Sequence, residues 1–237
     1  SKHMIELRPS AQRGISNLGW LYSKHTFSFS SYQDPQHIGF SDLLVINDDV
    51  VLPGMGFGTH PHRDMEIFSY VLEGGLAHKD SMDKDTVIRP GDVQMMSAGT
   101  GIRHSEYNAS DKEQVHFLQI WIEPAERGGR AGYEQQPLPV EAMRGCLRLV
   151  ASPDGAEGSA TIGQDARLYA SVLAGGESLD YVLAAGRLAY VHVVRGRLVL
   201  GDLLLATGDA AKIADEIRLS FKADEETEFL LFDLPPL

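Results

Sequence analysis

The sequence has a single cysteine, Cys146, so no disulfide within the chain can stabilise its fold. It has no run of 18 apolar residues, which excludes a helix that spans a membrane. Near the N-terminus no basic stretch precedes an apolar one, so there is no sign of a secretory signal. We therefore expect a reducing, cytoplasmic location. The residues before Met4, Ser1 to His3, look like a remnant of recombinant expression, and His3 is given no role.

Basic residues are scarce relative to acidic ones. The chain has 21 Lys and Arg against 33 Asp and Glu, a formal net charge of −12. Such a charge is repelled by the phosphates of a nucleic acid and by an anionic membrane surface. We therefore expect neither nucleic acid nor membrane as a partner.

Helical periodicity is also scarce, whereas short apolar stretches are frequent. Gly, Pro, Asp and Asn bound these stretches at close spacing, which predicts strands separated by turns. The clearest stretches are 43–46, 67–72, 93–96 and 115–122. Residues 165–174 fit neither the helix nor the strand period, so both readings stay open there. The pattern predicts an all-β barrel or sandwich.

The two halves of the 237-residue chain resemble each other in layout. Each has a strand, a glycine turn, a return strand, a Gly-Asp turn and a closing hydrophobic strand, which is the layout of a repeated β unit. The corresponding segments are 70–80, 89–99 and 117–124 in the first half, and 191–202, 206–214 and 229–236 in the second. The alternative is that Gly-Asp turns recur by chance, as they do in many β proteins.

Residues 123–139 are rich in Gly, Pro and charge and lie near the middle of the chain, so we interpret them as a linker region. We accordingly predict two tandem β-barrels, an N-terminal domain of residues 4–130 and a C-terminal domain of residues 131–237. Because a tandem pair reproduces the packing of two single barrels, we expect a monomer.

Two pairs of polar residues stand out in the first half. In 60-HPH-62, His60 and His62 project from the same face of a strand, because alternate side chains of a strand point the same way. In 104-HSE-106, His104 and Glu106 form a second such pair. Glu66 is an even number of positions from His60 and His62, so on a continuous strand it would have the same parity, that is, it would face the same side. Four or five of these side chains are expected to meet inside one barrel.

Three neutral imidazoles with one carboxylate suit iron, manganese, nickel, cobalt, copper or zinc, and the sequence does not choose among these metals. Three or four protein ligands leave coordination positions open for a substrate or dioxygen, which favours catalysis over a structural metal. The remaining histidines lack such paired neighbours, and we expect ordinary hydrogen-bonded roles for His25, His37, His78, His116 and His192. For His78, the face of the strand cannot be read from the sequence, because 74-GG-75 interrupts the alternation of side chains.

The segment from Gly54 resembles the first cupin motif, and residues 91–108 resemble the second, with a two-residue insertion and Ser97 where proline is usual. More closely, 58-GTHPHRDMEIFSYVLEGGLAHKDS-81 together with 95-MMSAGTGIRHSEYN-108 resembles the pirin family, in particular bacterial members with quercetin 2,3-dioxygenase activity. The resemblance covers nearly the whole chain. Its N-terminal motifs are long and specific, whereas the C-terminal half is similar mainly in layout and in its last residues.

This resemblance implies a bicupin, two tandem jelly-roll barrels, whose N-terminal barrel binds one metal, commonly Fe(II). The implied ligands are His60, His62, His104 and Glu106. It implies an ordinary role for Glu66, although in cupins generally the Glu of the first motif is often a ligand, and we follow the closer family. The C-terminal barrel has neither a His-x-His pair nor a counterpart of His104, so we expect it to be metal-free.

The implied activity is the cleavage of flavonols such as quercetin by O2, giving a depside and carbon monoxide without an organic cofactor. Metal coordination lowers the pKa of the flavonol 3-hydroxyl, and Glu106 is the candidate base that accepts its proton. Flat rings require apolar walls. The apolar side chains near the motifs, most of which we expect in the core, are Phe57, Phe68, Met95, Met96 and Phe117.

Two other functions stay open. Pirins also resemble regulatory proteins that bind protein partners, in which the metal is a structural or redox-sensing element. A sugar-isomerase-like cupin, in which the metal polarises a carbonyl group, is the third interpretation. Aerobic turnover of a flavonol with release of carbon monoxide distinguishes the dioxygenase from both.

Overall fold

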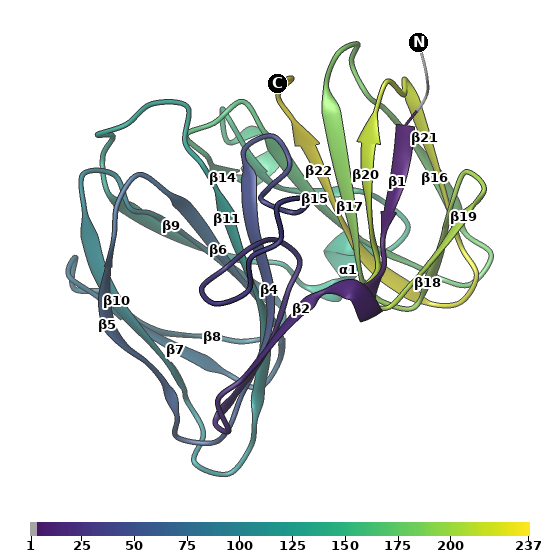
Figure 1. The fold of residues 1–237 in the computed structure, drawn as a ribbon. Coiled ribbons are helices and arrows are strands. Elements are labelled where there is room, and N and C mark those ends of the chain that lie inside the picture. The colour runs from purple at the N-terminus through teal and green to yellow at the C-terminus, as the bar shows by residue number, and fades with distance from the viewer. Residues whose placement is uncertain (1–3) are drawn as a thin grey trace. The chain divides into compact units, whose positions relative to one another are not determined.

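The computed structural model describes residues 4–237, so the expression remnant expected at residues 1–3 lies outside the described residues. Contacts divide the chain into two compact units (Figure 1). The N-terminal unit consists of residues 14–139 and 162–164, and the C-terminal unit of residues 4–13, 140–161 and 165–237. In the described part of the chain, no helix is both long and apolar enough to cross a membrane.

The N-terminal unit contains a seven-stranded and a four-stranded sheet. The order in the larger sheet is β12 (Gly132–Pro137), β9 (Asp92–Ser97), β6 (Glu66–Glu73), β11 (Val115–Ile122), β4 (Leu43–Val51), β3 (Leu21–His25) and β2 (Gly14–Asn17). The order in the smaller sheet is β5 (Gly56–His62), β10 (Ile102–Asn108), β7 (Leu76–Asp80) and β8 (Asp85–Ile88).

The C-terminal unit repeats this arrangement. Its larger sheet has the order β1 (Met4–Arg8), β20 (Ala210–Ala214), β17 (Leu188–Arg195), β22 (Thr227–Leu234), β15 (Arg167–Leu173), β13 (Arg148–Ser152) and β14 (Ala160–Thr161). Its smaller sheet has the order β16 (Ser178–Val182), β21 (Arg218–Ala223), β18 (Arg197–Leu200) and β19 (Leu203–Ala206). The short helices are η1 (Ser10–Gln12), α1 (Val140–Met143) and η2 (Ala156–Gly158).

The prediction of an all-β fold with two similar jelly-roll units is confirmed. The order β9-β6-β11-β4 in one unit corresponds to β20-β17-β22-β15 in the other, so the repeated layout is not a chance recurrence of turns. Among the described strands, none of one sheet is hydrogen-bonded to a strand of the other sheet in the same unit, so each unit is an open jelly roll and not a closed barrel. The ambiguous segment 165–174 contains a strand, β15, because it pairs with both β22 and β13.

The outermost strand of each larger sheet comes from an unexpected part of the chain. Residues 132–137, which we interpreted as linker and start of the second domain, form β12 and pair with β9 of the N-terminal unit. Residues 4–8 form β1 and pair with β20 of the C-terminal unit. The polar composition of 123–139 suits an edge strand as well as a linker, because an edge strand is half exposed. That residues 4–130 and 131–237 are separate folding domains stays a prediction.

Candidate metal centre and cavity

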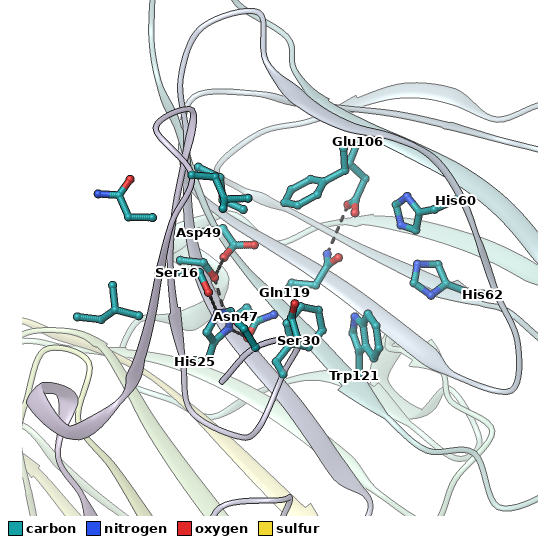
Figure 2. Close-up of a pocket in the computed structure, with 18 residues that line it drawn as sticks. Ser16, His25, Ser30, Asn47, Asp49, His60, His62, Glu106, Gln119 and Trp121 are labelled. Carbon is teal, nitrogen blue, oxygen red and sulfur yellow. Dashed lines mark hydrogen bonds between the residues drawn. The ribbon is translucent and has the colours of Figure 1, made fainter. Parts of the chain in front are cut away.

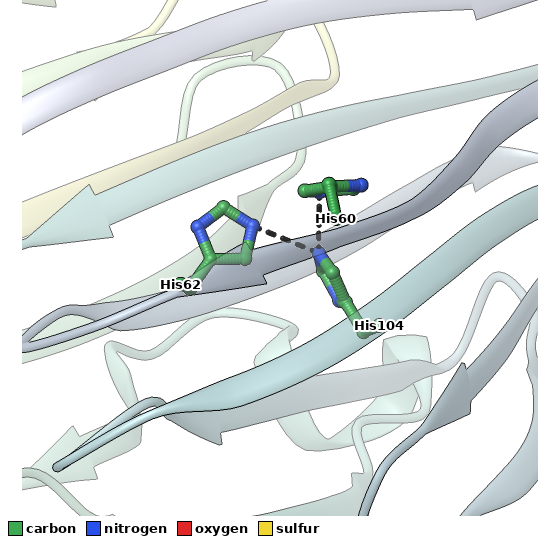
Figure 3. Close-up of side chains that lie close together, drawn as sticks. All are labelled: His60, His62 and His104. Atoms are coloured by element: carbon green, nitrogen blue, oxygen red, sulfur yellow. Dashed lines mark hydrogen bonds between the residues drawn. The ribbon is translucent and has the colours of Figure 1, made fainter.

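Two strands of the smaller N-terminal sheet bring the predicted histidines together. The antiparallel register of β5 and β10 places His104 opposite His60, and Ile102 opposite His62. The close approach of the strands depends on Gly56, where an added Cβ would lie 2.4 Å from the carbonyl oxygen of Glu106. The Nε2 atom of His104 is 2.9 Å from Nε2 of His62 and 2.9 Å from Nε2 of His60 (Figure 3). The three histidine side chains therefore converge, and that they bind a metal ion stays a prediction.

The spacing of these nitrogens fits one metal ion. Nitrogen ligands about 2.1 Å from an ion, at right angles to one another, are about 3 Å apart. Gly58 accepts a hydrogen bond of 2.7 Å from Nδ1–H of His60, which leaves the lone pair of that ring on Nε2. Burial, followed by the neighbouring imidazoles, lowers the pKa of His62 to about 4 and that of His104 to about 2. Neutral rings with converging lone pairs are what a cation requires.

Glu106 is buried next to the three histidines. Its Oε1 is 3.7 Å from Nε2 of His104. Ligand atoms of one ion lie between about 3 and 4.2 Å apart, depending on whether they are adjacent or opposite, so Glu106 is within reach of the same ion. Its other oxygen, Oε2, accepts hydrogen bonds from Ser69 Oγ at 3.3 Å and from Gln119 Nε2 at 3.4 Å. Burial raises the pKa of Glu106 above its ordinary value.

Glu66 does not share a strand with His60 and His62, so the parity argument for this residue was wrong. β5 ends at His62, and the chain turns through Asp64, whose φ is +49°, before β6 starts at Glu66 in the other sheet. Glu66 Oε2 there accepts a hydrogen bond of 2.7 Å from Ser97 Oγ. A turn that moves the chain between sheets resets the alternation of side chains, which is why parity could not be extended across it.

Three of the other histidines have the hydrogen-bonded roles that we expected, namely His25, His78 and His116. His78 donates from Nε2 to Asp80 at 2.6 Å and accepts from Gln94 Nε2 at 3.1 Å, and its ring centroid is 5.5 Å from that of His104. His116 donates from Nε2 to Asp48 at 2.6 Å. Within residues 4–237, the three-histidine cluster is the only group of side chains that fits a metal ion.

A cavity of about 550 Å³ in the N-terminal unit opens onto this cluster (Figure 2). His60, His62 and Glu106 line it together with apolar side chains, among them Phe57 and Trp121. The ring of Trp121 meets that of His62 edge-on, with centroids 5.2 Å apart. Such a cavity has the volume and the mostly apolar walls of a small-molecule site. Of the apolar residues near the motifs, Phe57 lines the cavity, and the other four are buried in the core, namely Phe68, Met95, Met96 and Phe117.

The cavity also has a polar side that our reading of the sequence did not identify. It consists of Ser16, Ser23, His25, Asn47 and Asp49, which lie on β2, β3 and β4. Burial raises the pKa of Asp49 to about 7. The sequence signal for part of this set was 43-LLVINDDVV-51, where Asn47 and Asp49 interrupt an apolar strand at positions of equal parity.

The C-terminal unit has apolar residues on the strand that corresponds to β10. β21 has the position in its sheet that β10 has in the other. The buried side chains of β21 are Leu219, Phe221 and Ala223, which belong to an apolar core cluster. That this unit binds no metal stays a prediction.

Residues 7–122 match the family model described as pirin, and residues 149–234 match that of the quercetinase C-terminal cupin domain. Over 234 residues the chain is 49% identical to a quercetin 2,3-dioxygenase of Escherichia coli strain K12, covering 99% of this chain and 100% of the relative. The chain belongs to the pirin family. A putative quercetin 2,3-dioxygenase of Pasteurella multocida is 39% identical to this pirin, covering 98% of this chain and 100% of the relative.

Solved structures confirm the fold of this pirin. The crystal structure of YhhW from Escherichia coli has a TM-score of 0.96 and 48% identity and covers 99% of each chain. The structure of the bacterial pirin YhhW in complex with nickel(II) has a TM-score of 0.95 and 48% identity, covering 99% of this chain and 100% of that one. The predicted resemblance to bacterial pirins is therefore confirmed.

Proposed function

We propose that this pirin is a metal-dependent dioxygenase that cleaves flavonols such as quercetin with O2 to a depside and carbon monoxide. The observation that carries the proposal is the convergence of three histidine nitrogens beside a cavity of about 550 Å³ with apolar walls. A purely structural metal requires no such cavity. The name of the 49% identical relative, quercetin 2,3-dioxygenase, supports the same reaction and substrate class.

In this proposal one divalent metal is held by His60, His62, His104 and Glu106. When bound, the metal supplies a Lewis acid that lowers the pKa of the flavonol 3-hydroxyl. Fe(II) is our first candidate, and the nickel(II) complex of YhhW makes nickel the second. Manganese, cobalt, copper and zinc also suit three imidazoles and a carboxylate.

Protein side chains accept the proton of the substrate and orient its rings. Ser69 and Gln119 both donate to Oε2 of Glu106, which leaves Oε1 to accept the proton of the 3-hydroxyl. A carboxylate whose pKa is raised by burial accepts a proton more readily than an exposed one. The rings of Phe57 and Trp121 line the cavity, where they orient a flat substrate and exclude water.

The decisive experiment is aerobic incubation of quercetin with metal-loaded and with metal-stripped protein, both prepared without a polyhistidine tag. We expect carbon monoxide in an amount equal to the flavonol consumed, and only with the loaded protein. Equal rates with loaded and stripped protein, or consumption without carbon monoxide, would contradict the proposal. Binding to a protein partner, a monomeric state and a cytoplasmic location stay predictions from the sequence.

A further inference from the structure

The polar side of the cavity, hereafter the polar floor, is built by the pairing of three strands. Ser16 of β2 pairs with Ser23 of β3, and Ser23 pairs in turn with Asp49 of β4. His25 of β3 pairs with Asn47 of β4. Figure 2 shows Ser16, His25, Asn47 and Asp49 on the opposite side of the cavity from His60 and His62, with Gln119 between the two groups. The cavity therefore has two polar ends.

The amide of Asn47 turns its oxygen toward His25. Oδ1 of Asn47 can only accept, so Nδ1 of His25 donates to it, at 2.7 Å. Burial lowers the pKa of His25, so the ring is neutral and its Nε2 accepts a hydrogen bond of 2.7 Å from Ser16 Oγ. The amide group Nδ2 of Asn47 has no hydrogen-bond partner among residues 4–237. A donor of Asn47 is thus available to the cavity.

Asp49 provides the complementary acceptor. Its Oδ1 accepts a short hydrogen bond from Ser23 Oγ. Its Oδ2 has no hydrogen-bond partner in the described part of the chain. The side chain is only 5% exposed, yet it lines the cavity. Buried polar groups without a partner are costly, so the group that fills the cavity is expected to satisfy both Asp49 and Asn47.

A hydroxyl group satisfies both at once, because it has one donor hydrogen and acceptor lone pairs. A phenolic hydroxyl is favoured over an aliphatic one, because the cavity between the two polar ends is lined by the aromatic rings of Phe29, Phe57 and Trp121. Phenols are also stronger donors than alcohols, as their lower pKa shows, and so suit a carboxylate acceptor.

We propose that the polar floor is a subsite that binds a phenolic hydroxyl of the substrate, which donates to Asp49 Oδ2 and accepts from Asn47 Nδ2. The subsite makes the protein selective for aromatic substrates with a hydroxyl on the ring distant from the three histidines. The identity of the substrate as a flavonol rests on the proposed function, whereas recognition of a phenol by Asp49 and Asn47 does not.

The test measures binding without turnover, by calorimetry on metal-loaded, full-length protein in the absence of oxygen. The probes are quercetin, with hydroxyls on both outer rings, and 3-hydroxyflavone, which has none there. The test variant is Asp49→Asn. The matched control is Asp48→Asn, because Asp48 is the next residue along the chain but bonds to His116 and does not line the cavity.

At about pH 8, above the pKa of Asp49, we expect Asp49→Asn to weaken quercetin binding about 10-fold or more, as the loss of a charged hydrogen bond does, and to leave 3-hydroxyflavone binding within about twofold of the wild type. The Asp48→Asn control should bind both probes as the wild type does. Ser23→Ala, which frees the carboxylate of Asp49 to rotate, should weaken quercetin selectively too, and it tests the subsite if Asp49→Asn does not fold. Equal weakening of both probes, or no weakening of either, would overturn the subsite.

The subsite and the proposed function fail in different ways. Selective binding of quercetin without carbon monoxide release in air would support the subsite and contradict the dioxygenase. Cleavage of quercetin and 3-hydroxyflavone with equal kcat/KM, together with equal affinities, would leave the dioxygenase standing and overturn the subsite.

Discussion

The Nε2 atoms of His62 and His104 lie 2.9 Å apart, although 42 residues separate the two histidines in the chain. They come from different strands, β5 and β10, so an ion bound between them connects these strands. Such an ion binds the folded chain in preference to the unfolded one, because only folding brings the ligands together. Metal binding and stability of the N-terminal unit are therefore coupled.

The first prediction concerns this coupling and the number of metal ions. We expect elemental analysis to find about one metal per chain, and thermal melting to show that added metal raises the stability by about 2.7 kcal/mol at a free concentration 100 times its Kd. His62→Ala should lose both effects. A content near two metals per chain would show that the C-terminal unit also binds metal.

The second prediction distinguishes the two glutamates of the motifs. We expect Glu106→Gln to lower kcat for flavonol cleavage by about 100-fold or more, because it removes both the base and a carboxylate from the three-histidine cluster. Glu66→Gln should retain metal and part of the activity, because Glu66 bonds to Ser97 in the other sheet. Loss of metal from Glu66→Gln, or a crystal structure with Glu66 bound to the ion and Glu106 turned away, would reverse the assignment.

The third prediction concerns the 3-hydroxyl of the substrate. Flavonols with a free 3-hydroxyl should be cleaved, whereas flavones, which lack it, should not, because only the former offer a proton to Glu106 and an oxygen to the metal. Oxygen consumption and carbon monoxide release on a matched flavonol and flavone pair measure this. Comparable turnover of the two compounds would rule out direct coordination of the substrate.

The fourth prediction uses the buried carboxyl of Asp49. Burial raises the pKa of Asp49 in the folded protein to about 7 from its ordinary value of 3.8, so between these values the folded state binds more protons than the unfolded state. The free energy of unfolding therefore falls as the pH rises through this window, by up to about 4 kcal/mol from this group. Asp49→Asn, which carries no charge, should lack this loss.

The measurement is urea denaturation of metal-stripped wild type and Asp49→Asn at about pH 4 and at about pH 8. The variant should gain stability relative to the wild type at the higher pH. A difference between Asp49→Asn and wild type that does not change with pH would show that folding does not raise the pKa of Asp49.

The sequence by itself determined the strands and the two pairs of site residues. The stretches 43–46, 67–72, 93–96 and 115–122 were recognisable because a strand buried by its neighbours is apolar along its length. The pairs His60 with His62 and His104 with Glu106 were recognisable because alternation along one strand is a local property. Both signals lie within about ten residues, and neither depends on which strands are neighbours.

Only the tertiary structure decided where Glu66 lies and what forms the polar floor. The turn at Asp64 takes the chain from β5 in one sheet to β6 in the other, and parity does not pass through such a turn. The polar floor combines residues of β2, β3 and β4 through their register. Strand pairing also decides that β12 joins the larger sheet of the N-terminal unit and that β1 joins the larger sheet of the C-terminal unit. Strand pairing depends on contacts between residues far apart in the chain, and the energies that select one register over another are not contained in any local stretch of sequence.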